Sequence, residues 1–316
     1  MKIVLLDRES IGMDTPIEPL SRFGEVVVYN ATARDEIADR VCDADVIIIN
    51  KVKITADVLD AAKMLKLICI FATGYDNIDV NSAREHGVAV CNVPGYSTAS
   101  VTATTVATVL SLLTNLREYN DYVASGAYSA SGRPNLLTPV FHDMTGKVWG
   151  IIGCGDIGSS VARVAEAFGA TVITHQRHKH PVYDTVSLYE LCERADIITI
   201  HCPLTPETRS MIDADAIGKM KENVIIVNSA RGAVLDECAI ATAVSEGRIS
   251  AFGCDVYSVE PFGKEHPYYA IKGNRNVLLT PHFAWGSYEA RTNCLNIICK
   301  NISAFIEGKT LNRVDI

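Results

Sequence analysis

The chain has 316 residues, 48% of them hydrophobic, and a formal net charge of −8 at pH 7. This length is enough for two domains of ordinary size, and the negative charge argues against a general affinity for nucleic acid or for an anionic membrane. The ten cysteines include no C-x-x-C pair, which favours free thiols in a reducing cytosol over a disulfide framework or a zinc site. The apolar run at residues 3–6 is too short for a signal peptide, and no apolar run reaches membrane-spanning length.

Apolar runs alternate with helical patterns through the first hundred residues. Strands are predicted at 2–6, 26–29, 46–49, 67–71 and 88–91, with helices such as 34–41 and 56–62 between them. Continuous apolar strands alternating with helices are typical of a parallel α/β sheet covered on both faces.

Two loops of this first unit follow the carboxyl ends of strands, where open α/β sheets bind ligands. One contains Asn50 and Lys51, and the other spans residues 72–77. Small residues in the second loop could present backbone N–H groups to an anion. Each loop could equally be an ordinary connection between a strand and a helix.

A long segment at 97–116 has neither glycine nor proline. Its length predicts a helix that connects two domains, although its many threonines favour strands. The following stretch, 117–147, mixes glycine, proline, serine and tyrosine, which predicts irregular and exposed chain.

Residues 148–177 give the clearest signal in the sequence. A β-branched and apolar run precedes Gly153, Gly155 and Gly158, and an Ala/Val-rich helical pattern and a second strand follow. The glycines fit G-x-G-x-x-G, which permits a tight turn, close approach of a pyrophosphate, and close packing of helix on strand. The helix N-terminus then offers free N–H groups to the phosphates. A plain glycine turn is the alternative.

The second strand of such a unit usually ends in an acid that holds the adenosine ribose hydroxyls. Gln176 stands there instead, followed by Arg177 and Lys179. A guanidinium binds a ribose 2′-phosphate that a carboxylate would repel, so the stretch favours NADP(H) over NAD(H). The alternatives are a solvated basic loop that tolerates either cofactor and a metal site built from His175, His178 and His180, which lacks a nearby acid or cysteine.

The rest of the chain continues the α/β pattern. Strands are predicted at 196–200, 224–227, 249–254 and 277–279, and a final helix at 287–307. That helix has an apolar face at helical spacing, with Gly308 as its C-cap. The apolar face consists of Leu295, Ile298, Ile302, Phe305 and Ile306.

Three polar residues lie at or beyond the ends of these later strands: Arg231, Glu260 and His282. Each alone could be a surface cation, a turn residue or a core histidine. Together, at the ligand-binding edge of a dinucleotide sheet, they supply what hydride reduction of a 2-keto acid needs. These needs are a cation for the carboxylate, a proton donor for the carbonyl oxygen, and a carboxylate that keeps the donor protonated.

Seven segments carry a resemblance to a known family. They are ATGYDNID at 72–79, NVPGYST at 92–98, TGKVWGIIGCGDIG at 145–158, HCPLTPETR at 201–209, VNSARGAVLDE at 227–237, CDVYSVEP at 254–261 and LLTPHFAW at 278–285. The sequence resembles the D-isomer-specific 2-hydroxyacid dehydrogenases, and within them the glycerate dehydrogenase (hydroxypyruvate reductase) group.

The resemblance implies two doubly wound parallel-sheet domains. A Rossmann cofactor domain at 99–286 would be inserted in a flavodoxin-like substrate domain at 1–98, completed by 287–316. It also implies a homodimer formed through the cofactor domain, with a small 2-keto or 2-hydroxy acid as substrate.

The resemblance further implies site residues. Arg231 would hold the substrate carboxylate and keto oxygen, and Glu260 would pair with His282 as the acid/base. Lys51 and the backbone N–H groups of Thr73 and Gly74 would also contact the substrate. The implied cofactor contacts are Thr105, Gly153, Gly155, Asp156, Ile157, Gly158, Gln176, Arg177, Cys202, Pro203, Ser229, Ala230 and Asp255, the last facing the nicotinamide carboxamide.

Two other functions fit the same scaffold. One is oxidation of phosphite or formate. Formate is disfavoured because formate enzymes of this type resemble a variant motif with glutamine before the catalytic histidine, whereas Pro281 precedes His282 here. The other is a dinucleotide sensor that binds protein partners, since such sensors can retain all three polar residues. The primary expectation is a cytoplasmic reductase of hydroxypyruvate or glyoxylate with NADPH favoured.

Overall fold

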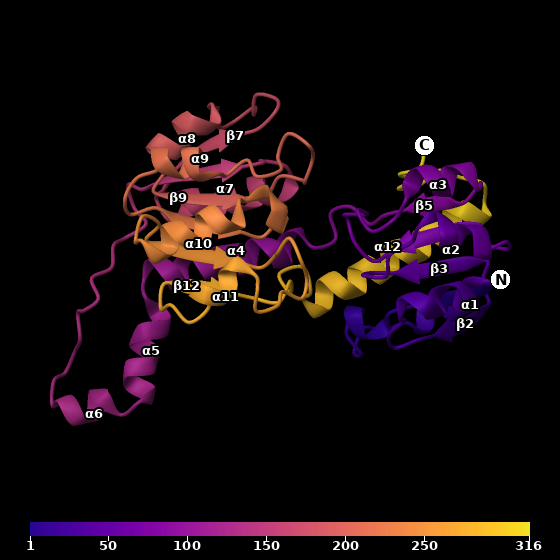
Figure 1. Cartoon of the computed structure of the whole chain (residues 1–316), viewed down its shortest axis with the longest axis horizontal. Coiled ribbons are helices and arrows are strands. Elements are labelled where there is room, and N and C mark those ends of the chain that lie inside the picture. The colour runs from indigo at the N-terminus through magenta and orange to yellow at the C-terminus, as the bar shows by residue number, and fades with distance from the viewer. The chain divides into compact units, whose positions relative to one another are not determined.

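The computed structural model describes all 316 residues. The chain folds into two compact units (Figure 1), one formed by Met1–Ser97 with Trp285–Ile316 and the other by Thr98–Ala284. Each unit is built on a parallel sheet. The predicted fold class is confirmed: the five-stranded order β2-β1-β3-β4-β5 is flavodoxin-like, and the seven-stranded order β12-β11-β10-β9-β6-β7-β8 extends the Rossmann arrangement.

The first unit contains short, buried strands. They are β1 (Lys2–Leu5), β2 (Glu25–Val28), β3 (Val46–Ile49), β4 (Leu67–Ile70) and β5 (Ala89–Cys91). Alternate residues of each strand face opposite sides of a sheet, and two apolar clusters accordingly cover the two faces. Ile3, Ile48 and Cys69 belong to one cluster, and Val4, Ile47 and Ile68 to the other.

Helices from both ends of the chain cover these faces. They are α1 (Ile37–Val41), α2 (Ala56–Ala61), α3 (Val80–Glu85) and α12 (Tyr288–Ile306), with 3₁₀ turns at Arg8–Ile11, Glu18–Phe23 and Arg34–Glu36. Figure 1 shows α12 in yellow against the indigo and purple elements of this unit. Its residues Leu295, Ile298 and Ile302 are fully buried, but Ile306 is 54% exposed, so the predicted apolar face was one residue too long.

The second unit holds the longer sheet. Its strands are β6 (Val148–Ile152), β7 (Thr171–His175), β8 (Asp184–Thr185), β9 (Ile197–Ile200), β10 (Ile225–Asn228), β11 (Ala251–Cys254) and β12 (Val277–Leu279). The helices are α4 (Thr98–Leu113), α5 (Leu116–Ala124), α6 (Ala127–Ser131), α7 (Asp156–Ala167), α8 (Leu188–Arg194), α9 (Ala214–Lys219), α10 (Glu237–Ser245) and α11 (Pro267–Ile271), with a 3₁₀ turn at Gly232–Val234. All paired strands are parallel, so their carboxyl ends share one edge of the sheet.

One sequence prediction fails between α4 and β6. The chain from 117 to 147, expected to be irregular, contains α5 and α6. The helix predicted at 97–116 is present as α4, which ends at Leu113 because Asn115 adopts a left-handed conformation, with φ of 52°. No single helix is long and apolar enough to cross a membrane, and α4 with α5 meets that criterion only as a pair bent by 68°. The segment of α5, α6 and the loop after them projects from the second unit as an arm (Figure 1).

Candidate active site and cofactor site

The glycine loop between β6 and α7 shows why each glycine is there. Gly153 has φ of +86°, and a Cβ on it would lie 2.5 Å from the Cys202 nitrogen. A Cβ on Gly158 would lie 2.3 Å from the Gly153 oxygen, so helix and loop can pack only without one. By contrast, no atom lies within 4 Å of the Cβ position at Gly155. This open space at the N-terminus of the twelve-residue helix α7 suits a dinucleotide pyrophosphate.

Gln176, at the end of β7, turns its side chain onto this loop. Its Oε1 accepts the N–H of Cys154 at 3.0 Å, and its Nε2 donates to the carbonyl of His178 at 2.8 Å. Arg177 is exposed. The pKa of Glu207 is lowered, mainly by a hydrogen bond from Thr205 and in smaller part by the charge of Arg177, so one acid shares the neighbourhood of this guanidinium.

The histidines near Gln176 have separate partners. His175 Nδ1 lies 3.1 Å from the Val186 carbonyl, and His180 Nδ1 accepts the N–H groups of Val182 and Tyr183. No group of three or more His, Cys, Asp or Glu side chains is placed to hold a metal ion.

A short polar chain joins three residues beside the sheet edge. Thr105 Oγ1 on α4 lies 2.9 Å from Ser229 Oγ, which lies 3.5 Å from His201 Nδ1. Burial lowers the pKa of His201 to about 3, so its imidazole is neutral at physiological pH. Thr105 and Ser229 were predicted as cofactor contacts, whereas His201 was missed. Its position directly before Cys202 and Pro203 was the available signal.

Glu260 and His282 form a pair on the turns that follow β11 and β12. Glu260 Oε2 lies 2.7 Å from His282 Nδ1, and Glu260 Oε1 accepts the N–H of Tyr257 at 3.0 Å. The two side chains are 30% and 24% exposed. A carboxylate on Nδ1 fixes the ring orientation, and Nε2 is the other ring atom that can transfer a proton.

Asp255 shapes the turn that carries His282. Its buried carboxylate accepts hydrogen bonds from Thr280 Oγ1 at 2.6 Å, Phe283 N at 3.0 Å and Ala284 N at 2.9 Å. His282 itself has φ of 53°, a strained conformation that its surroundings must maintain. Asp255 therefore supports the histidine turn, and its contact with nicotinamide stays a prediction.

Arg231 follows β10 in a turn held by Asn228. The Asn228 side chain accepts the N–H of Ala230 at 3.0 Å and donates to the Arg231 carbonyl at 2.9 Å. A Cβ on the next residue, Gly232, would lie 2.1 Å from the carbonyl carbon of Tyr257. The arginine turn thus packs directly on the turn that carries Glu260, and the structure brings the three predicted catalytic residues to one edge of the sheet.

The predicted substrate loops of the first unit are also held together. Asn77 Nδ2 in the loop after β4 donates to the Val52 carbonyl at 2.7 Å, and Thr73 Oγ1 donates to the Val93 carbonyl at 2.7 Å. The buried Asp7 carboxylate accepts the N–H of Lys51 at 2.6 Å. Asp7 was not predicted, because the backbone N–H groups that its carboxylate accepts belong to the distant residues 50–52.

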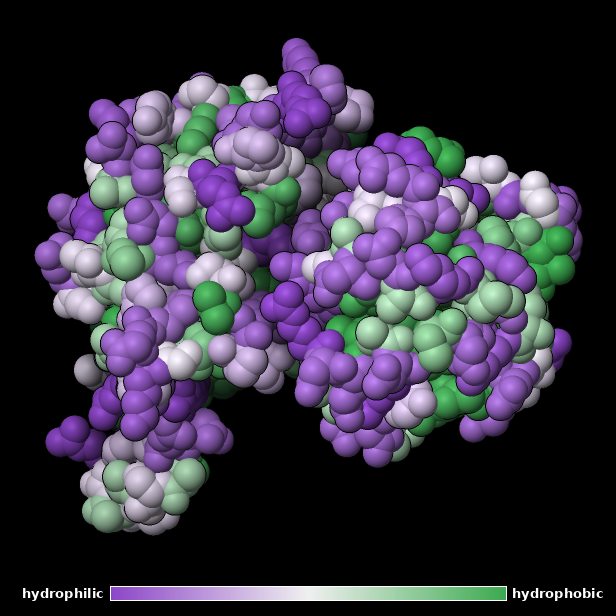
Figure 2. All heavy atoms as spheres, turned by 45° about the vertical axis from the view of Figure 1, so that its right-hand side comes forward, coloured by the Kyte–Doolittle hydropathy of each residue, from purple (hydrophilic) through white to green (hydrophobic).

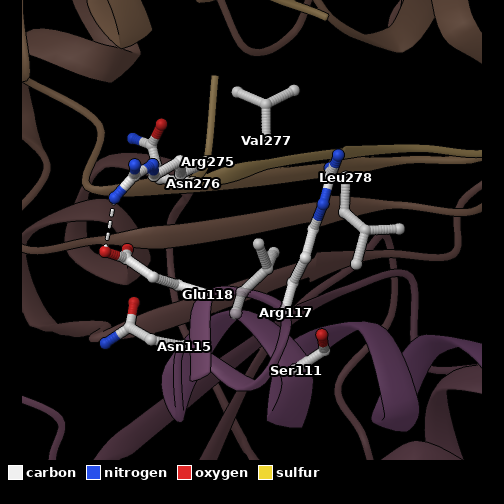
Figure 3. Close-up of a pocket in the computed structure, with 9 residues that line it drawn as sticks. Ser111, Asn115, Arg117, Glu118, Arg275, Asn276, Val277 and Leu278 are labelled. Carbon is white, nitrogen blue, oxygen red and sulfur yellow. Dashed lines mark hydrogen bonds and ion pairs between the residues drawn. The ribbon is translucent and has the colours of Figure 1, made fainter. Parts of the chain in front are cut away.

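A separate pocket in the second unit lies between α4, α5 and β12 (Figure 3). Arg275 and Glu118 form an ion pair of 2.6 Å at its rim. Its lining includes Arg117 and Ser111 but no predicted site residue.

Comparisons with known proteins agree with this geometry. Residues 106–284 match the family model described as D-isomer specific 2-hydroxyacid dehydrogenase, NAD binding domain. The chain is 33% identical to a hydroxypyruvate reductase of Blautia hydrogenotrophica over 324 residues, covering 100% of both chains. It is 35% identical to a glycerate dehydrogenase of Methylorubrum extorquens over 315 residues, covering 99% of both. Among solved structures, an acyclic imino acid reductase in complex with NADPH and D-Arg matches with a TM-score of 0.89 and 27% identity, covering 99% of this chain and 100% of that one.

Proposed function

The chain belongs to the D-isomer specific 2-hydroxyacid dehydrogenase family, and from that premise we propose that it reduces hydroxypyruvate and glyoxylate, with NADPH preferred. Membership makes it an oxidoreductase that uses a nicotinamide cofactor on small 2-keto or 2-hydroxy acids. The full-length similarity to hydroxypyruvate and glycerate enzymes supports the choice of substrate.

The Glu260–His282 pair is the observation that carries the proposal. His282 would donate the Nε2 proton to the keto oxygen, and Glu260 at 2.7 Å would stabilise the imidazolium before that transfer. Arg231 would bind the substrate carboxylate and keto oxygen with its planar guanidinium. The bound nicotinamide supplies the hydride that adds to the keto carbon.

The resemblance also predicts substrate contacts in the first unit. The N–H groups of Thr73 and Gly74 are in the loop after β4, and Lys51 is exposed in the loop after β3. The hydrogen bonds of Asn77 and Asp7 hold these loops in defined conformations. Such preorganised donors bind an anion without further ordering cost.

Two features support the preference for NADPH. Gln176 is uncharged and its oxygen is engaged with Cys154, so no carboxylate at this position would repel a 2′-phosphate. Arg177 is the next residue and is exposed, which suits charge-assisted binding. Glu207 opposes this effect, because its carboxylate is close enough to Arg177 for the two charges to interact.

We also propose a cytoplasmic homodimer formed through the arm of the second unit. Leu116, Val123, Leu137 and Val140 of this arm are 58–72% exposed. In Figure 2 the arm is the lobe at the lower left, and its end is pale to light green. Exposed apolar surface of this kind marks protein contacts. Analytical ultracentrifugation of the wild type and of a variant with Leu137→Ser and Val140→Ser would test it, with a monomeric wild type as the contrary result.

The test of the function is an assay of NADPH and NADH oxidation against a panel of 2-keto acids. Phosphite and formate would be assayed in the oxidative direction. Turnover of hydroxypyruvate or glyoxylate above the other acids, lost in His282→Asn, is expected. A wild type that binds the cofactor but turns over no acid would favour a dinucleotide sensor instead, and turnover of phosphite would favour that oxidation.

A further inference from the structure

Two consecutive amides in the turn after β11 are bound by two different carboxylates. The N–H of Tyr257 donates to Glu260 Oε1 at 3.0 Å, and the N–H of Ser258 donates to Glu237 Oε1 at 2.9 Å. Ser258 Oγ also donates to the other oxygen of Glu237 in a short hydrogen bond. The turn that carries Glu260 is therefore fixed by one acid from within and by a second acid from outside.

Glu237 is itself held firmly. It is the first residue of α10, and its side chain is only 9% exposed. His266 Nε2 lies 3.0 Å from Glu237 Oε2, and His266 Nδ1 accepts the N–H of Tyr268. Nε2 makes no hydrogen bond, so the contact of His266 with Glu237 is one of close approach alone. The rings of Phe262 and Tyr268 pack on His266 at 4.9 and 5.0 Å, which leaves little freedom to the pair.

The stability of α10 does not account for this arrangement. The N-cap of the helix is the neighbouring residue Asp236, whose side chain accepts the N–H of Ala239 at 3.0 Å. The carboxylate of Glu237 instead points away from the helix, toward Ser258 and His266. A nearly buried carboxylate is costly unless its oxygens are satisfied, and here the donors are the N–H and the hydroxyl of Ser258, in the turn of Glu260.

We propose that Glu237 is a positioning residue for the Glu260–His282 pair. By fixing Ser258 it sets the direction of the turn, and through Tyr257 the direction of the Glu260 carboxylate that meets His282. This inference rests on the proposed function, since it assigns Glu237 to the orientation of the proposed proton donor. Misplacing a catalytic group by about 1 Å can cost as much as about a hundredfold in rate.

The test compares Glu237→Gln, Glu237→Ala and Ser258→Ala with the wild type. Ser258→Ala removes only the hydroxyl hydrogen bond, Glu237→Gln keeps two acceptor lone pairs on one oxygen, and Glu237→Ala removes every contact. The single-turnover rate of keto-acid reduction should fall least in Ser258→Ala, more in Glu237→Gln and most in Glu237→Ala. In Glu237→Ala the loss of rate should reach about ten- to a hundredfold. The Kd of NADPH should stay within about twofold of wild type, because the hydrogen bonds of Glu237 and Ser258 do not involve the glycine loop.

Asp236→Ala is the matched control. It removes the cap of the same helix, so its Tm should fall while its single-turnover rate stays at the wild-type value. Equal rates in wild type, Ser258→Ala and Glu237→Gln would overturn the inference, as would a rate loss in Asp236→Ala as large as that in Glu237→Ala. A wild type inactive on every keto acid would instead overturn the proposed function.

Discussion

The side-chain oxygen of Gln176 lies 3.0 Å from the amide nitrogen of Cys154, inside the glycine loop. This contact ties the end of β7 to the loop that starts α7, and it uses the amide oxygen of Gln176 within the protein. An aspartate at this position would add a negative charge beside the place where a ribose 2′-hydroxyl or 2′-phosphate would bind. We therefore expect the glutamine to influence which cofactor is accepted.

We expect kcat/KM for NADPH to exceed that for NADH by at least about tenfold, since a charge-assisted contact to phosphate contributes roughly 1.5 to 3 kcal/mol. A double variant, Gln176→Asp with Arg177→Ser, should reverse the ratio by adding repulsion and removing attraction. The ratio is measured at low salt with saturating keto acid, and it should shrink at high salt because the site is open to solvent. A wild type whose kcat/KM for NADH equals or exceeds that for NADPH would contradict the predicted preference for NADPH.

Glu260→Gln should lower the single-turnover rate of keto-acid reduction by at least about tenfold. The carboxylate of Glu260 lies 2.7 Å from Nδ1 of His282 and orients the ring for proton transfer. A neutral amide provides a weaker hydrogen bond and no charge to hold the ring in place. The measurement is the single-turnover rate of both proteins at the same pH, with the melting temperature as the folding control. Equal rates would mean that the pair has no part in the reaction.

Arg231→Lys should raise KM and lower kcat by at least about a hundredfold each in a protein that still folds. A lysine ammonium is a point charge that cannot bind carboxylate and keto oxygen bidentately. Steady-state kinetics with hydroxypyruvate would test this role of Arg231, with the melting temperature as the folding control. Kinetics close to wild type would rule out the proposed role of Arg231.

His201 should make the protein sensitive to acid. Its pKa is lowered to about 3 by burial, while an unfolded histidine has a pKa of about 6.5. Between these values the unfolded state binds up to one more proton than the folded state. The free energy of unfolding therefore decreases as the pH is lowered, by up to about 1.4 kcal/mol per pH unit. Urea unfolding at pH 6.5 and 4.5 should show a smaller decrease for His201→Gln than for wild type. Identical decreases would show that this imidazole takes up no proton on unfolding.

The sequence predicted the parts of the molecule that local pattern controls. The apolar strands and the glycine loop are each determined by neighbours in the chain, and their positions agree with the structure to within one or two residues. The pairing of Glu260 with His282 was expected from the resemblance, not from spacing. What these residues do in the reaction remains a prediction.

Other features depended on contacts that no local pattern shows. The break at Asn115 lies in a segment without glycine or proline, so nothing nearby signalled it. Glu237 reads as an ordinary acid in the first turn of a helix, and only the fold brings it to Ser258. Asp255 was assigned to a ligand, but its three donors come from residues 280–284.

The division of the first unit between the two chain ends has a consequence for its synthesis. Residues 1–97 are translated before the second unit, but α12, which covers the sheet face containing Ile3, Ile48 and Cys69, is translated after it. The second unit is contiguous, from Thr98 to Ala284, so it can complete its core while synthesis continues. The N-terminal strands therefore keep one apolar face uncovered until α12 has been made, and the unit that begins the chain is the second to complete its core.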